Sequence, residues 1–151
     1  MDIDDLTQPD AELKYLRERM RANIAFGLGA LLIATYGLVD DKTIKTLMGI
    51  FGIFCALMLL YSTVISHSLG KSMNKKDVDS RNYSDEYLNF IHHKAYKHAF
   101  DITAVVTGFM WYWSIKEDDL MFSTSSCLAL VVAALGLGYG FSVFYLLRKS
   151  A

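Results

Sequence analysis

The densest group of chemically active side chains lies at residues 92–98, which read His-His-Lys-Ala-Tyr-Lys-His. Two histidines that bind one metal ion from a helix are typically four residues apart. Four residues after His92 stands a tyrosine, and four residues after His93 stands a lysine. This spacing predicts no metal site. The sequence places no carboxylate or cap to act with a histidine in general acid–base catalysis, so we expect no catalytic residues.

The same segment favours the binding of an anion. Cations stand beside tyrosines, a mixture that contacts phosphates and stacks on bases. The alternative is contact with anionic lipid headgroups, which basic residues next to a membrane also make. If the ligand is a nucleotide or an oligonucleotide, the candidate binding residues are Arg17, Arg21, Lys75, Lys76, Arg81, His92, His93, Lys94 and Lys97.

Four long apolar segments must position these side chains. They cover residues 22–39, 47–69, 99–115 and 120–147, and Asp101 is the one full charge within them. Each is long enough to cross ~30 Å of hydrocarbon as a helix, which takes ~20 residues with a lower limit of ~17. Open sheet edges cannot be satisfied in lipid, so strands are excluded. The sequence therefore predicts an all-α integral membrane protein with four transmembrane helices, embedded in the lipid bilayer.

The first and third of these helices are expected to extend into the cytoplasm. Residues 1–21 are predicted to form an amphipathic helix continuous with the first span, because Leu13, Leu16 and Met20 recur at helical spacing. Residues 22–151 then form the transmembrane domain, with a cytoplasmic connection at 70–98. A second apolar stripe that contains Leu88 and Ile91 leads into the third span and is the natural partner of the first.

The distribution of basic residues predicts the orientation. Of the 15 lysines and arginines, all but Lys42, Lys45 and Lys116 lie in the N-terminal segment, the middle connection or the C-terminal tail. Basic residues concentrate on the cytoplasmic side of membrane proteins. We therefore expect a multi-pass protein of the inner (plasma) membrane with both termini in the cytoplasm.

The two halves of the chain share one plan: a cytoplasmic helix, a span, a short acidic outer turn, a second span and a basic end. An offset of 78 residues aligns Asp40-Asp41 with Asp118-Asp119 and Tyr61 with Tyr139. An even number of spans in each half makes such a repeat parallel, with its axis along the membrane normal. The alternative is that two-span hairpins resemble one another through hydropathy alone.

Small and polar residues within the spans suggest where helices meet. Gly136 and Gly140 form a GxxxG motif, which lets helix backbones approach closely. They pack either within the chain or between subunits. Asn23 and Asp101 occupy equivalent positions near the cytoplasmic entrances of the first and third spans. Asp101 either pairs with Lys97 one turn earlier or contributes to a ring of carboxylates at a pore mouth.

Three classes of function fit these features, and none requires a cofactor. The first is a homo-oligomeric channel or membrane-permeabilising effector, gated from its cytoplasmic side. The second is a non-catalytic membrane anchor or scaffold that binds a cytoplasmic protein through Leu13, Leu16 and Met20 and through the basic loop of the middle connection. An enzyme of lipid or quinone chemistry ranks last, because no acid–base or metal constellation is visible.

The layout of the chain, with four spans and a basic cytoplasmic face, resembles small bacterial membrane effectors of antiphage defence operons. An example is the channel partner of nucleotidyltransferase systems of the Hailong type. The resemblance implies a multimeric channel that a nucleotide or nucleic-acid ligand controls.

Overall fold

The computed structural model describes residues 8–72, 85–116 and 123–149. These residues form four helices and no strand, which confirms the all-α prediction. The helices are α1 (Gln8–Tyr36), α2 (Lys42–Ser72), α4 (Glu86–Lys116) and α5 (Thr124–Lys149). Pro9 lies in the first turn of α1, where its missing N–H costs no hydrogen bond. No further proline follows, and α1 runs unbroken through Gly27 and Gly29, from its charged first half into its apolar second half.

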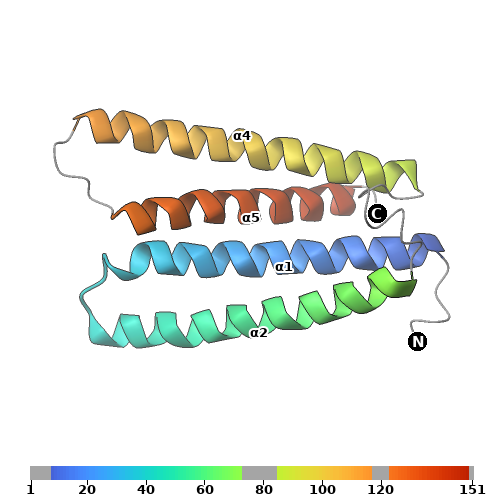
Figure 1. The fold of residues 1–151 in the computed structure, drawn as a ribbon, viewed down its shortest axis with the longest axis horizontal. Coiled ribbons are helices and arrows are strands. Elements are labelled where there is room, and N and C mark those ends of the chain that lie inside the picture. Colours follow the sequence, from blue (N-terminus) through green and yellow to red (C-terminus); the bar gives the residue numbers. More distant parts are fainter. Residues whose placement is uncertain (1–7, 73–84, 117–122, 150–151) are drawn as a thin grey trace.

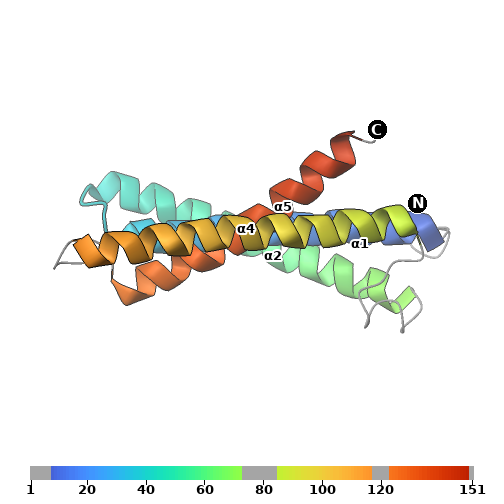
Figure 2. The same ribbon diagram turned by 90° about the horizontal axis from the view of Figure 1, so that it is seen from above.

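The four helices form a bundle whose members lie in a row, in the order α2, α1, α5, α4 (Figure 1). Helices α1 and α5 form the central pair, α2 packs along α1, and α4 packs along α5. Helix α4 touches α1 near one end, where the Asp85 N–H donates to Glu12 Oε2 at 3.4 Å. Figure 2 shows α2 and α5 inclined in opposite directions across α1 and α4.

The apolar core lies near the end of the bundle at which α1 begins and α5 ends (Figure 1). Leu16 of α1 is fully buried there, among Leu88 and Ile91 of α4 and Val143 of α5. Leu13 and Met20 pack against the same cluster. The stripe at the start of α1 thus meets the stripe at the start of α4, as the periodicity predicted.

Two aspartates cap helices. Asp41 Oδ1 accepts hydrogen bonds from the N–H groups of Thr43 and Ile44, at 2.7 and 3.0 Å, and begins α2. Asp85 Oδ1 accepts the Tyr87 N–H at 2.7 Å at the start of α4. These bonds satisfy N–H groups that have no partner within the helix. The bonds from Ile44 and Thr43 favour the charged carboxylate and lower the pKa of Asp41 below its usual value.

Two of the helices, not four, are long and apolar enough to cross a membrane by length and composition alone. They are α2, over Lys42–Gly70, and α5, over Thr124–Lys149. Helix α1 falls short because it ends at Tyr36 and carries Asn23 and two arginines close to its apolar half. Helix α4 falls short because Asp101, His98 and several threonines and aromatic residues dilute its apolar segment.

The order of the row differs from the expected parallel repeat. Such a repeat would exchange α1 with α4 and α2 with α5. Helix α1 lies at the centre of the row, however, and α4 lies at its edge. The physical reason is that glycines let the backbones of α1 and α5 approach each other closely. The first helix of one half therefore pairs with the second helix of the other half.

Candidate functional site

His92 was expected to bind a ligand on the surface, and the structure corrects this. His92 is 1% exposed, and its Nδ1 lies 2.8 Å from the hydroxyl of Tyr139, which is itself buried. Tyr96 packs edge-on against His92, with ring centroids 4.7 Å apart, and also against Tyr139 at 4.8 Å. His92 therefore joins α4 to α5 inside the bundle and cannot meet a ligand from solvent.

One feature of the amino-acid sequence pointed to this polar pair. Tyr139 carries a hydroxyl in the middle of the apolar helix α5, and a buried phenol normally finds a hydrogen-bond partner. The partner stands 47 residues away in the chain. Glu12 and Glu18 were missed in the same way: both are buried on α1, although charged residues are seldom fully buried without a partner.

The other candidate cations of α4 remain on the surface. His93, Lys94 and Lys97 are exposed on the half of α4 that holds His92. The ammonium of Lys94 lies 5.1 Å from the ring centroid of Phe90, which holds the cation against the helix. Lys97 stands one turn before Asp101. These three side chains form an accessible cationic surface at the end of the bundle where α1 begins.

The candidate cations of α1 differ from one another. Arg17 is exposed. Arg21 Nη1 donates to Glu18 Oε1 at 2.6 Å in a helical i, i+3 ion pair, so much of its charge is already offset. The remaining candidates, Lys75, Lys76 and Arg81, lie outside the described residues.

Asn23 and Asp101, the expected pore mouth, are not brought together within one chain. Asn23 Nδ2 donates to the Arg19 carbonyl at 2.8 Å, and Asn23 is half-buried on the central helix α1. Asp101 is exposed on α4, at the edge of the row. Among the described side chains, no ion pair joins Asp101 to Lys97. A shared mouth would need more than one copy of the chain.

Gly136 and Gly140 face α1 of the same chain. A Cβ at Gly136 would lie 2.8 Å from the Asn23 carbonyl oxygen and 3.0 Å from Gly27 Cα. A Cβ at Gly140 would collide with the Ile24 side chain and lie 3.2 Å from the Met20 carbonyl oxygen. The GxxxG motif thus holds α5 against α1, which is the intramolecular alternative.

The outer face of α4 carries a stripe of charged and small residues among exposed apolar side chains. Lys97, Asp101, Ala104 and Gly108 follow one another at helical spacing and are all exposed. Large apolar side chains flank them: Phe100 is 70% exposed and Val105 is 73% exposed. A shallow hollow of about 410 Å³ lies along this face, lined by Phe100, Thr103, Ala104, Thr107, Gly108 and Trp111.

Three polar atoms of α1 and α2 are buried. Glu18 Oε2, Ser62 Oγ and Ser66 Oγ have no hydrogen-bond partner among the described residues. Ser66 also lines a cavity of about 310 Å³ between the two helices, together with Arg19 and Asn23. Buried polar atoms of this kind are commonly satisfied by water.

Within the described ranges, no three His, Cys, Asp or Glu side chains are placed to hold a metal ion. Comparison with known protein families, with curated protein sequences and with solved structures finds no match to this chain.

Proposed function

We propose that this chain is a membrane-embedded subunit that assembles with copies of itself into a channel gated from the cytoplasmic side. All four helices then cross the bilayer, and the outer face of α4 lines the pore. One observation carries the proposal: Asp101 is exposed at the edge of the row, among apolar side chains that are also exposed.

The cost of Asp101 in lipid supports this arrangement. A carboxylate facing hydrocarbon costs about 2.5–3.5 kcal/mol at the centre of a helix and less near the ends, and such residues face a protein neighbour or a water-filled cavity. Asp101, near the cytoplasmic entrance of its span, carries the smaller cost. Among the described residues, α4 packs along α5 alone for most of its length, so no described helix covers Asp101. A ring of copies around a pore would give it water, with Ala104 and Gly108 further along the same face.

The exposed apolar surface supports the membrane placement. Of the apolar window of α2, 11% is buried within the molecule. A core helix of a soluble protein is mostly buried, whereas a helix that faces lipid need not be. Ile53, Leu57 and Leu60 are each at least 60% exposed on this helix. One row of helices also encloses no pore by itself, so a channel requires several copies.

The cytoplasmic trigger follows from the exposed cations. In the assembled channel, His93, Lys94 and Lys97 would lie above Asp101 at the pore mouth, where a nucleotide or oligonucleotide would bind. Such a ligand opens the channel if it binds the open state better than the closed one. The scaffold alternative has less support, because Leu16, with Leu13 and Met20 packed beside it, contacts the chain's own core and is not free to hold a partner.

Planar-bilayer recording on the purified protein tests the channel. The Asp101→Asn variant should lower selectivity for cations over anions, seen as a shift of the reversal potential in a salt gradient. Glu86→Gln, which removes the same charge at the exposed start of α4, is the matched control and should shift the reversal potential less.

The same recordings test the gating. Replacing Lys94 and Lys97 by Glu should abolish gating by a short DNA oligonucleotide. Absence of current under every voltage and this oligonucleotide would refute the channel.

A further inference from the structure

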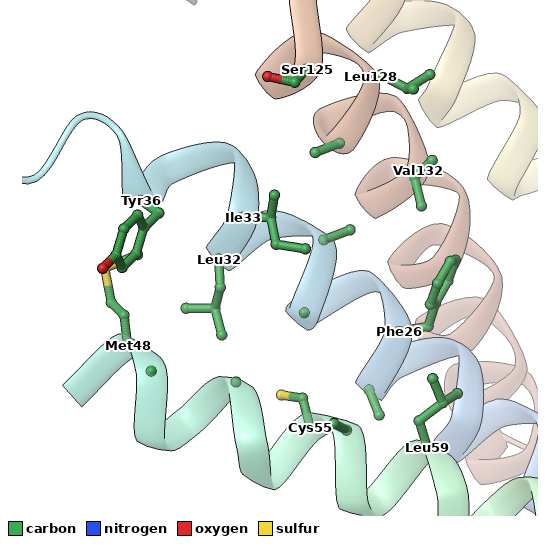
Figure 3. A pocket seen from close by; sticks show the side chains of 17 residues that line it. Phe26, Leu32, Ile33, Tyr36, Met48, Cys55, Leu59, Ser125, Leu128 and Val132 are labelled. Carbon is green, nitrogen blue, oxygen red and sulfur yellow. The ribbon is translucent and has the colours of Figure 1, made fainter. Parts of the chain in front are cut away.

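An apolar groove runs along α1 between α2 and α5 (Figure 3). Its volume is about 680 Å³. Helix α1 lies between the other two helices in the row, and its small residues Ala25, Gly29 and Ala30 form the floor of the groove. The walls are formed by residues of α2, among them Met48, Gly49 and Leu59, and by residues of α5, among them Ser125 and Leu128.

The two ends of the groove differ. Figure 3 shows Tyr36 and Met48 at one end and Phe26 and Leu59 at the other. The ammonium of Lys45 lies 5.5 Å from the ring centroid of Tyr36, which puts a cation at the first end. Ser125 lines the groove and shares a hydrogen bond of 2.8 Å with Ser123. The groove is therefore polar at one mouth and apolar along the rest of its length.

The groove has the length of one leaflet. Tyr36 and Phe26 are ten residues apart on α1, or ~15 Å at 1.5 Å per residue. This is half of the ~30 Å hydrocarbon core of a bilayer. Tyrosine and lysine are residues that mark the boundary between hydrocarbon and headgroups. The polar mouth is thus placed where a headgroup would lie, with the apolar part reaching toward the bilayer midplane.

The polar mouth of the groove decides between two occupants. A helix of a second copy would have to bring an anionic group to the cation of Lys45 beside Tyr36. A phospholipid supplies both parts, an acyl chain for the apolar length and a phosphate for the cation. A hydrocarbon chain is also thin and can bend into the space. The charge at the mouth and the length of one leaflet therefore favour an acyl chain.

From these observations we propose that the groove binds one acyl chain of a membrane phospholipid, with the lipid phosphate at Lys45. The inference rests on the membrane placement proposed above. The Asp41 carboxylate near this mouth accepts two N–H groups at the start of α2, so its charge is partly offset by the helix. Lys45 remains available as the cation for the phosphate.

The test uses the full chain in vesicles of phosphatidylcholine and phosphatidylglycerol. A trace of phosphatidylcholine with a photoreactive diazirine midway along one acyl chain is cross-linked, and the labelled peptides are identified by mass spectrometry. Gly49→Leu fills the groove, because a Cβ at Gly49 meets no atom within 4 Å. Gly108→Leu makes the same change at a glycine of α4 that is equally open and lies outside the groove.

We expect labelling of the α1, α2 and α5 segments that line the groove, reduced several-fold in Gly49→Leu and unchanged in Gly108→Leu. If Gly49→Leu lacks the helix content of the wild type, Leu128→Trp fills the groove from α5 instead. Equal labelling in the filled and wild-type proteins would overturn the lipid site. So would a wild-type groove without label combined with a change of oligomer mass in Gly49→Leu, which would assign the groove to a second copy.

The same vesicles separate this inference from the membrane placement on which it rests. Protein that floats with the vesicles in a density gradient but shows no groove labelling refutes the lipid site alone. Protein that stays at the bottom of the gradient refutes the membrane placement as well. A Lys45→Glu variant should lower the labelling obtained with a phosphatidylglycerol probe, and labelling unaffected by this change would remove the phosphate from Lys45.

Discussion

The hydrogen bond between His92 and Tyr139 links α4 to α5 in a region where few other polar groups meet. Both residues are at least 97% buried. If the bond is lost, neither side chain can replace it with a hydrogen bond to water. A buried hydrogen bond contributes ~0.5–1.5 kcal/mol net, but leaving one of its partners unsatisfied costs ~1–3 kcal/mol. The edge-on contact of Tyr96 with His92 further restricts the imidazole. The pair thus fixes how α4 sits on α5.

Removing the Tyr139 hydroxyl should therefore destabilise the protein. We expect Tyr139→Phe to lower the free energy of unfolding by ~1–3 kcal/mol, measured by denaturant titration in detergent. Tyr145→Phe, on the exposed face of the same helix, is the control and should change it little. Combining Tyr139→Phe with His92→Leu should recover part of the loss, because no polar partner is then left. Equal effects of the two tyrosine variants would contradict the structural role of the bond.

At the scale of helices, α1 and α5 are held together by glycine backbones. A Cβ at Gly27 would lie 2.7 Å from the Leu137 backbone nitrogen, and one at Gly136 would lie 2.8 Å from the Asn23 carbonyl oxygen. Because the obstructing atoms belong to the backbone, a side-chain rotation cannot relieve either clash. Close approach of this kind maximises van der Waals contact, which is how helices associate in lipid.

The GxxxG motif should accordingly control the fold of the monomer before it affects any oligomer. We expect Gly136→Leu to lower the melting temperature of the protein in detergent, because overpacking of a tight contact costs ~1–3 kcal/mol or more. Gly108→Leu, at a glycine with open space around it, should leave the melting temperature nearly unchanged. A Gly136→Leu protein that melts like the wild type and changes only its oligomer mass would return the motif to the subunit interface.

These contacts also explain which features the sequence could predict. Hydrophobic periodicity located the helices and paired the stripe of Leu16 with that of Leu88 and Ile91, because both signals are local to a helix face. The lateral order of the row depends on which glycines meet, such as Gly27 and Gly136, and no periodicity encodes that choice. The burial of His92 depended on Tyr139 of another helix, so a basic cluster read along the chain assigned it to the surface.

At the scale of the whole molecule, the bundle has two distinct ends along its helix axes. The start of α1, the end of α5 and the buried core lie at one end, and the connection between α1 and α2 lies at the other (Figure 1). The exposed cations His93 and Lys94 lie on the half of α4 at the end where α1 begins. In a bilayer, the excess of lysine and arginine there would keep this end in the cytoplasm. The groove mouth at Lys45 would then open toward the outer leaflet.

Cysteine labelling in cells can test that orientation, with Cys55 and Cys127, both free thiols, replaced by alanine. A membrane-impermeant maleimide should label Asp41→Cys in cells whose inner membrane is intact, because position 41 is exposed in the turn before α2. It should label His93→Cys only after that membrane is opened, because position 93 is exposed at the opposite end. His93 is a better reporter than His92, whose burial would block the reagent from either side.

The reverse labelling pattern would invert the protein and place Lys94 and Lys97 outside the cell, where no cytoplasmic ligand could gate a pore. Equal labelling of both positions in intact cells would exclude a fixed orientation across the membrane.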